Sequence, residues 1–507
     1  MVSLMLTICG TSVMAQGVPT PQPVAADTQV GVYYFPGWSA PEKWYCLKAS
    51  DTAIQPLLGY YPEGDPEVAD WHIKWALEHG VSFFAFDHYV RGGGEMLETA
   101  LVDGFMQAEH IGQFQFCLNW CNHAPAETQT LEELEAFEDV VIEKYLTHPS
   151  YLRKDGKAVV MILSGYSFVK TLGIDGAKAA FDAFDQRCRD AGLEGLYLVF
   201  CEGGINGEQA IKDSFAAGVD AFCLYNYPYA GTDYTGPGEY GEAPYADLLA
   251  QCQGLSSHWG NLTEARFWPT VMSGWDRRPW TKDRDLVRTG TTPELFGEQL
   301  RTAKGHVNAD NIVMIEAWNE WGEGSVLEPS VEWGFEYLEK VREVFSDDGR
   351  RLSSRDDKPH YDVELPVVSD WRFDTGPVQW GRSACAEPTI EWGKLVTTSE
   401  SDDPQLTSPP TYLDCAEYGS MRLRMRLTGE GDARTATGQL FWETVEMRMR
   451  AETSVLFDVE VDGRWHEYEV DLTEAPAWRG MTDRLRLDPV NEPGVKIEID
   501  RLRILRK

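Results

Sequence analysis

The first two thirds of the chain alternate between strand-length apolar runs and longer amphipathic segments. Eight runs of apolar, β-branched or aromatic residues lie at 29–35, 81–87, 114–120, 157–163, 196–202, 219–225, 266–272 and 311–318. Continuous apolar runs are typical of strands that are covered on both faces. Segments with helical periodicity follow at 66–79, 95–111, 131–147, 174–192, 207–217, 292–307 and 331–346. This repetition predicts a (β/α)8 TIM barrel over residues 29–346.

The pattern changes beyond residue 346. Residues 347–364 are charged, polar and aperiodic, which is typical of a linker. Segments that alternate between apolar and polar positions follow at 421–427, 445–452 and 457–472. Alternation of this kind predicts half-buried antiparallel strands, and the Asp462-Gly463 turn in the last segment predicts a hairpin. We therefore expect residues 365–507 to form an all-β, jelly-roll-like sandwich.

The first 28 residues precede the predicted barrel. Residues 1–15 form a short apolar stretch that ends in Val13-Met14-Ala15, a spacing that signal peptidases accept, and the proline-rich residues 16–28 read as a linker. We therefore expect a signal peptide and export to the periplasm or the cell exterior. No later apolar run approaches the roughly 20 residues of a membrane helix, so we expect no membrane partner.

Charge and composition narrow the classes of partner. The 507 residues include 45 basic and 81 acidic ones, a net charge of -36, which repels phosphate backbones and argues against nucleic acid. Aromatic residues make up 12% of the chain, a composition that suits stacking on sugar rings. The cysteines and the ten histidines lack the spacing of metal ligands, so we expect no metal and no cofactor. Cys385 and Cys415 are the pair that we consider for a disulfide bridge.

Chemistry in a barrel of this type belongs at the carboxyl ends of the strands. The polar and aromatic residues at these ends, which we expect to bind substrate, are Tyr34, Asp87, His88, Asn119, Trp120, Glu202, Tyr225, Tyr227, Trp275, Asp276, Trp318 and Asn319. Each has the alternative of packing at the barrel rim. Segments 36–65 and 226–245 are predicted loops on the same face, and Arg277 and Arg278 are expected on the surface.

Glu320 and Glu323 are the strongest candidates for catalysis. They stand in Trp318-Asn319-Glu320-Trp321-Gly322-Glu323-Gly324, directly after the eighth predicted strand. Cleavage of a glycosidic bond needs one carboxyl group that donates a proton and one that accepts a proton or attacks, and tryptophan walls would supply the desolvation that separates their pKa values. The alternative is a pair of solvated loop acids. Glu316 reads either as a third carboxylate of the site or as an ion-pair partner inside the barrel.

This motif resembles the hallmark of the glycoside hydrolase family 99 group and its WbsX-like relatives. Further matches are Gly31-Val32-Tyr33-Tyr34, the strand 80–87, the strand 116–120, and His148-Pro149-Ser150-Tyr151 with Asp155-Gly156-Lys157. The resemblance implies a TIM barrel that cleaves α-linked, mannose-containing glycans within the chain with retention of configuration. It also implies that Glu320 deprotonates the 2-hydroxyl of the sugar while Glu323 serves as general acid and then as base.

Other functions stay open beside hydrolysis of a polysaccharide or glycan. The same carboxylates would serve a glycosyltransferase or transglycosylase of the WbsX type, although no Asp-x-Asp motif of a nucleotide-sugar enzyme is present. A glycan-binding protein without catalysis and a metal-dependent hydrolase rank lower. The tryptophans of the sandwich are Trp371, Trp380, Trp392, Trp442, Trp465 and Trp478. Exposed, they would make the domain a carbohydrate-binding module with a second glycan contact; buried, they form its core.

Overall fold

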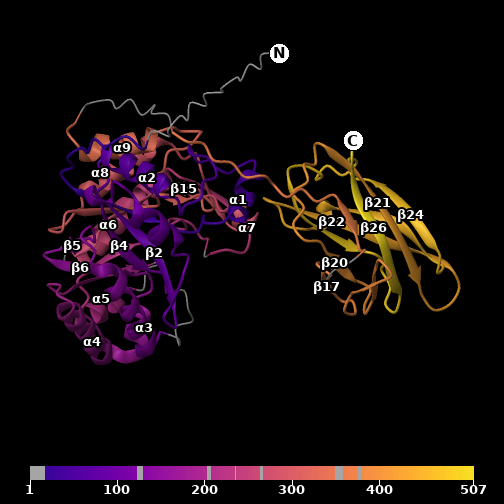
Figure 1. Ribbon diagram of the computed structural model, residues 1–507, viewed down its shortest axis with the longest axis horizontal. Coiled ribbons are helices and arrows are strands. Elements are labelled where there is room, and N and C mark those ends of the chain that lie inside the picture. Colours follow the sequence, from indigo (N-terminus) through magenta and orange to yellow (C-terminus); the bar gives the residue numbers. More distant parts are fainter. Residues whose placement is uncertain are drawn as a thin grey trace, which may run out of the picture.

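The chain forms two bodies, a helix-covered barrel and a body of strands, joined side by side (Figure 1). This computed structural model describes residues 17–122, 129–202, 207–234, 236–262, 266–348, 358–374 and 378–507. The predicted signal peptide, 1–15, lies outside these residues. Among the helices described, none is long and apolar enough to cross a membrane.

The first body is a closed parallel barrel. Its strands are β1 (Gln29–Tyr34), β2 (Phe83–Arg91), β4 (Gln115–Trp120), β6 (Lys157–Ile162), β7 (Leu196–Glu202), β8 (Ala221–Leu224), β10 (Phe267–Trp268), β11 (Thr270–Met272) and β13 (Ile312–Glu316). Pro269 divides one strand into β10, which pairs with β8, and β11, which pairs with β13, so the ring closes through it. Proline lacks the N–H that an uninterrupted ladder needs. The predicted barrel and its eight strands are confirmed.

Helices surround the barrel. They are α1 (Pro41–Lys48), α2 (Pro66–Glu78), α3 (Leu131–Val141), α4 (Tyr166–Asp190), α5 (Gly207–Ala216), α6 (Asp247–Leu262), α7 (Arg278–Thr281), α8 (Pro293–Lys304) and α9 (Glu336–Phe345). Helices α2, α3 and α8 begin at Asp65, Thr130 and Thr292, whose side chains accept a hydrogen bond from a backbone N–H of the first turn. Helix α4 starts earlier than predicted and is kinked at Gly173, whose φ is 71°.

The prediction of one helix over 95–111 is wrong. The segment contains β3 (Gly94–Met96), a π turn (Ala100–Gly104) and two short 3-10 turns (Phe105–Gln107 and Ile111–Gln113). Gly104 explains the interruption, because a Cβ at this position would lie 2.5 Å from the carbonyl oxygen of Glu63. The segment therefore keeps helical geometry only in short separate turns.

Short strands lie at both ends of the barrel. β5 (Arg153–Lys154) pairs with β6, and β9 (Gly241–Pro244) pairs in parallel with β12 (Leu286–Thr289). β14 (Asn319–Glu320) and β15 (Ser325–Val326) form a small antiparallel pair after β13. Segments 36–65 and 226–245 were predicted as loops, but they contain α1 and β9.

The second body is a β-sandwich. Its strands are β16 (Asp370–Arg372), β17 (Gly381–Ser383), β18 (Thr389–Glu391), β19 (Lys394–Thr398), β20 (Gln405–Thr407), β21 (Tyr418–Thr428), β22 (Arg434–Thr444), β23 (Ser454–Val461), β24 (Trp465–Asp471), β25 (Thr482–Asp488) and β26 (Lys496–Arg506). One layer has the order β17-β20-β25-β22-β23 and the other β24-β21-β26-β19-β18, with β16 also paired to β26. A single residue pair, Leu427 of β21 with Val461 of β23, joins the two layers into one sheet. The two layers share one apolar core, to which Trp442 and Met421 contribute from opposite sides. The predicted sandwich is confirmed.

Three details of the sandwich differ from the prediction. The turn at Asp462-Gly463 connects β23 and β24, but these strands pair with β22 and β21 rather than with each other. The predicted strand over 445–452 is wrong: residues 445–450 form no strand, Ala451–Thr453 form a 3-10 turn, and Val445 packs against Ala49 of the barrel. Cys385 and Cys415 are buried free thiols and not a disulfide bridge. Alternation in residues 445–450 therefore reflects a contact between the domains.

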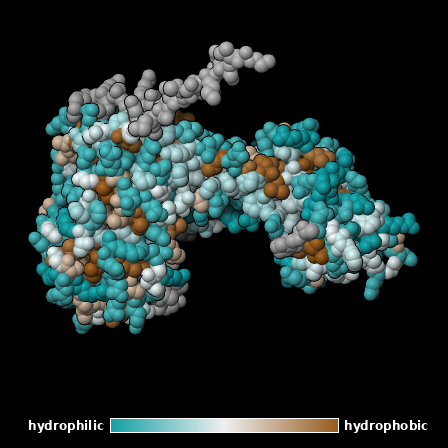
Figure 2. Space-filling view, in the orientation of Figure 1, coloured by the Kyte–Doolittle hydropathy of each residue, from teal (hydrophilic) through white to brown (hydrophobic). Residues whose placement is uncertain are grey.

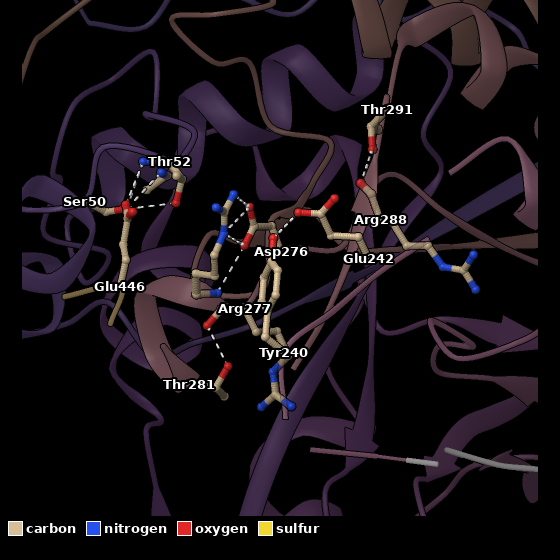
Figure 3. A network of polar contacts seen from close by, with 12 residues as sticks. Ser50, Thr52, Tyr240, Glu242, Asp276, Arg277, Thr281, Arg288, Thr291 and Glu446 are labelled. Atoms are coloured by element: carbon tan, nitrogen blue, oxygen red, sulfur yellow. Dashed lines mark hydrogen bonds and ion pairs between the residues drawn. The ribbon is translucent and has the colours of Figure 1, made fainter. Parts of the chain in front are cut away.

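Polar contacts fix the sandwich to the barrel. The Ser50 hydroxyl and the Thr52 backbone N–H donate to Glu446 Oε1 at 2.6 and 2.9 Å (Figure 3). Lys282 Nζ, at the end of α7, lies 2.8 Å from Asp483 Oδ2. Figure 2 shows a largely hydrophilic surface on this face, with hydrophobic residues in small separate patches. The domains are thus held by specific hydrogen bonds and ion pairs beside the apolar packing of Val445 on Ala49.

Candidate active site

A cavity of about 340 Å³ opens at the carboxyl ends of the barrel strands. Five sequence candidates line it: Asp87, Tyr225, Trp275, Glu320 and Glu323. The other lining residues are Phe35, Tyr89, Cys121, Leu163, Asn226, Pro228, Tyr229, Arg277 and Trp280. The cavity thus combines three carboxyl groups with aromatic walls.

The turn between β14 and β15 brings Glu320 and Glu323 to this cavity. The backbone N–H of Glu323 donates to the carbonyl oxygen of Glu320 at 3.0 Å, and Gly324 has a φ of 66° that favours glycine. A Cβ on Gly322 would lie 1.9 Å from the Trp280 ring, so only glycine lets that ring pack here. The glycines of the motif thus shape the turn and admit an aromatic wall.

Glu323 is paired with a cation. Arg277 Nε lies 3.2 Å from Glu323 Oε1, and Arg277 Nη1 lies 3.1 Å from Asp285 Oδ2. Burial raises the pKa of Glu323 to about 7, although Arg277 acts in the opposite direction. A carboxyl group with this pKa can both donate and accept a proton near neutral pH.

Glu320 belongs to a second polar group. The Tyr225 hydroxyl lies 2.6 Å from Asp87 Oδ2 and 3.1 Å from Glu320 Oε1, and Asn119 Nδ2 donates to Asp87 Oδ1 at 2.9 Å. Burial, and then the nearby Glu323, raise the pKa of Glu320 well above its ordinary value. Burial raises the pKa of Asp87 to about 6, against the hydrogen bonds from Tyr225 and Asn119. The two catalytic candidates therefore have different surroundings.

Glu316 lies fully buried at the end of β13. Ser325 Oγ donates to Glu316 Oε2 at 2.9 Å, and burial raises the pKa of Glu316 well above its ordinary value. No basic partner for it appears among the described residues, so the ion-pair alternative is wrong. Glu316 does not line the cavity, and its repulsion of Glu320 contributes to the raised pKa of that group.

Several sequence candidates point away from the cavity, because neighbouring residues of a strand face opposite sides. Tyr34 turns outward and its hydroxyl contacts His72 Nδ1 at 3.2 Å. His88 lies 3.5 Å from Glu95 Oε1, outside the ring of strands. Trp120 stacks on Phe137 of α3 with ring centroids 4.2 Å apart. The expectation that Tyr34, His88 and Trp120 contact substrate is therefore corrected.

Three further candidates support the rim instead of lining the cavity. The Tyr227 hydroxyl donates to the Thr270 carbonyl oxygen at 3.1 Å. Trp318 is fully buried against Phe84. The Asn319 side chain accepts from Phe35 N and donates to Phe35 O, both at 2.9 Å. Asn319 thereby fixes the backbone of Phe35, which lines the cavity.

The three remaining candidates do not line the catalytic cavity as described: they are Asn119, Asp276 and Glu202. Asn119 is fully buried and reaches the site through Asp87 and Cys121, which both line the cavity. Asp276 forms a bidentate pair with the neighbouring Arg278 and lines an adjacent cavity of about 320 Å³. Glu202 ends β7, but its side chain lies outside the described residues.

Sequence reasoning missed the most important cation of the site. Arg277 was expected on the surface, yet it joins Glu323 to Asp285 and lies over Trp275, 5.4 Å from the ring centroid. Its neighbour Trp280, also missed, is 37% exposed at the cavity edge. The only sequence signal was an arginine beside strand-end acids. In the described part of the chain, no group of three or more His, Cys, Asp or Glu side chains could hold a metal ion.

The fold and site define a (β/α)8 barrel with paired carboxyl groups at the carboxyl ends of its strands. The chain belongs to the family described as "Glycosyltransferase WbsX", which matches residues 52–341. The uncharacterized protein WxcX of Xanthomonas campestris pv. campestris, strain B100, is 23% identical over 310 residues, which cover 57% of this chain. The matched region spans 43% of the length of that relative.

Solved structures are similar at lower identity. A "glycoside hydrolase-like protein" is 20% identical, with a TM-score of 0.49 over 65% of this chain and 98% of that one. The family 99 endo-alpha-mannosidase of Bacteroides thetaiotaomicron is 15% identical, with a TM-score of 0.44 over 63% and 97%. A mutant of the carbohydrate-binding module CBM29-2 is 12% identical over 27% of this chain and 92% of its own, with a TM-score of 0.20.

Proposed function

We propose that this protein is an exported, retaining glycoside hydrolase that cleaves α-linked, mannose-type glycans within their chains. The convergence of Glu320 and Glu323 in one aromatic-walled cavity, in two different electrostatic environments, carries the proposal. Aromatic faces suit the apolar faces of sugar rings, and a water-poor cavity strengthens the action of the carboxyl groups. We propose mannose as the sugar because the Trp318–Gly324 motif resembles that of the family 99 glycoside hydrolases.

In the proposed reaction, Glu320 removes the proton from the sugar 2-hydroxyl, whose oxygen attacks the anomeric carbon. Glu323 gives its proton to the leaving glycosidic oxygen as that bond breaks, and a 1,2-anhydro sugar results. Glu323 then takes a proton from water as the water oxygen attacks the anomeric carbon, and Glu320 returns its proton to the 2-oxygen. Two displacements give net retention, and the pKa of about 7 at Glu323 suits its two roles.

Transfer to an alcohol is the second candidate function, and the family description favours it. If a sugar hydroxyl replaces water in the second step, the same groups make a new glycosidic bond. An assay for it therefore includes acceptor sugars beside the glycan.

We also propose that the sandwich contacts the glycan. A cavity of about 540 Å³ lies between the domains, lined by Tyr240 and Arg278 of the barrel and by Met447 and Arg479 of the sandwich. The Tyr240 ring is 44% exposed, and α7 separates this cavity from the catalytic one, because Arg278 lines the first and Trp280 the second. A long glycan in the catalytic cavity could cross α7 and reach the sandwich.

Product analysis tests the hydrolase proposal. The purified protein is incubated with α-mannans and with other α- and β-glycans, beside Glu320→Gln, Glu323→Gln and the exposed control Glu298→Gln. We expect cleavage by wild type and control, products that first appear in the α-configuration by NMR, and loss of activity in both site variants. Undiminished cleavage by folded Glu320→Gln and Glu323→Gln would refute the assignment. Glycan binding without cleavage by wild type would support a binding protein instead.

A further inference from the structure

One tyrosine hydroxyl stands between two carboxyl groups of the cavity. Tyr225 Oη lies 2.6 Å from Asp87 Oδ2 and 3.1 Å from Glu320 Oε1. A hydroxyl has a single proton to donate, whereas an ionised carboxylate can only accept. Each contact has a donor of its own only if one of the two carboxyl groups is itself protonated. The geometry therefore favours one more proton among Tyr225, Asp87 and Glu320.

The residues around Asp87, Tyr225 and Glu320 favour keeping this proton on one of the three. Tyr89 and Cys121 face Asp87 and Glu320 from the cavity wall, and Glu323 and Glu316 repel a charge on Glu320. Arg277, a cation that lines the same cavity, is held by Glu323 and Asp285. Neither Asp87 nor Glu320 has an ion-pair partner among the described side chains, so ionising both at once is unfavourable.

This arrangement presents a difficulty for the proposed reaction. Glu320 must be ionised to accept the proton of a sugar hydroxyl, yet a buried carboxyl beside two other acids tends to keep its own proton. Loss of that proton to bulk water would leave two adjacent negative charges in the cavity. A proton acceptor inside the cavity would avoid this cost.

We propose that Asp87 and Tyr225 are positioning residues that take up the proton of Glu320 and thereby convert it into a base. The proposal rests on the proposed function and deepens it. The Glu320 O–H bond breaks as its proton passes to Tyr225 Oη, while the Tyr225 O–H bond breaks as that proton passes to Asp87 Oδ2. The net charge is unchanged. Asp87 ends neutral and Glu320 ends ionised, with Tyr225 now donating to it.

Asn119 is suited to this exchange. Its amide donates to Asp87 Oδ1 at 2.9 Å, the oxygen that does not contact Tyr225. This bond leaves Asp87 Oδ2 free to gain or lose a proton without rearrangement of the side chain. Because the exchange is internal, the fraction of ionised Glu320 does not change with pH while the pair Asp87 and Glu320 holds one proton.

Infrared spectroscopy tests the shared proton without any glycan. Wild type at pH 8 is compared with Glu320→Gln, Tyr225→Phe and the distant control Tyr468→Phe. Beside the absorption of protonated Glu316, we expect a second protonated-carboxyl component that is missing in Glu320→Gln. It should shift in Tyr225→Phe, because a hydrogen-bond partner is lost, and stay unchanged in the control. A wild-type spectrum identical to that of Glu320→Gln in this region would overturn the proposal, because Glu320 would then carry no proton.

The pH dependence of cleavage tests the exchange itself. Loss of the Asp87 charge would, by electrostatics alone, move the acid limb of kcat/KM to lower pH in Asp87→Asn. The exchange predicts the opposite. In Asp87→Asn the acid limb of kcat/KM should move to higher pH by about one unit, because Glu320 must now lose its proton to water. A shift to lower pH with unchanged kcat would refute the exchange. If wild type cleaves no glycan while the infrared band behaves as expected, the hydrolase proposal fails and the shared proton stands.

Discussion

Arg277 Nε lies 3.2 Å from Glu323 Oε1, and this contact opposes the effect of burial on the proton affinity of the proposed acid. Without this contact, burial would raise the pKa of Glu323 further. A cation at hydrogen-bond distance stabilises the ionised form and keeps the group able to release its proton. Arg277 is held in turn by Asp285, so its position does not depend on Glu323 alone.

Replacement of Arg277 should therefore shift the basic limb of the pH profile. In Arg277→Gln the positive charge is lost, the pKa of Glu323 rises from about 7, and the loss of activity at alkaline pH moves upward. Arg277→Lys is the matched control, because it keeps the charge and should keep most of the wild-type profile. The measurement is kcat/KM against pH with a cleaved glycan. An unchanged basic limb in Arg277→Gln would show that Glu323 is not the group titrating there.

Glu323 should also make stability depend on pH. Its pKa is raised from 4.5 to about 7 in the folded protein, so between these values the native state keeps a proton that the unfolded state has lost. Stability must then fall as pH rises through this window, by up to about 3 kcal/mol. Glu323→Gln has no such charge, so we expect its Tm to exceed that of wild type at pH 8 and to match it at pH 4. Equal Tm values at both pH values would contradict the raised pKa.

The barrel could be predicted from sequence. Which side chains at the strand ends point into the cavity could be predicted only in part. Asp87 faces the cavity and His88 faces outward, which follows from strand alternation within β2. The same rule separates Tyr33, which contacts Cys201 inside the barrel, from Tyr34. Beyond the ends of strands the rule fails. Tyr225 and Tyr227 share parity, yet the chain has left β8 and the two side chains diverge.

The contacts around the glutamate pair could not have been predicted. Arg277 and Glu323 are far apart in sequence, and their segments meet where the backbone N–H of Asp276 donates to the carbonyl oxygen of Glu323. Contacts between the domains also produced a sequence pattern that is typical of a strand. The alternation at 445–450 arises because Val445 packs on the barrel while Arg448 and Arg450 form ion pairs with Asp283. Patterns of apolar residues predict which residues are buried, but not which part of the protein they pack against.

Gly322 should be needed for glycan affinity. A methyl group at this position would meet the Trp280 ring at 1.9 Å and push it from the cavity edge. We expect Gly322→Ala to raise KM severalfold and to destabilise the protein by about 1–3 kcal/mol, the usual range for overpacking. Gly254→Ala in α6 is the control, because its Cβ would meet no atom within 4 Å. Wild-type KM in Gly322→Ala would mean that the Trp280 ring does not contact the glycan.

The length of the substrate should reveal whether the sandwich takes part. If a glycan crosses α7 into the cavity between the domains, Tyr240→Ala and Arg479→Ala remove contacts that only long chains reach. We expect kcat/KM to fall about tenfold for long glycans, the effect of about 1.4 kcal/mol of lost binding, and to be unchanged for the shortest cleaved oligosaccharide.

Trp392→Ala is the matched control for this comparison. Its indole is 95% exposed at the turn between β18 and β19, and it does not line the cavity between the domains. Loss of activity on long glycans in Trp392→Ala alone would place the second contact on that turn. An equal loss on short and long glycans in Tyr240→Ala would instead mean that the mutation disturbs the catalytic cavity through α7, and the sandwich would then be a structural companion of the barrel.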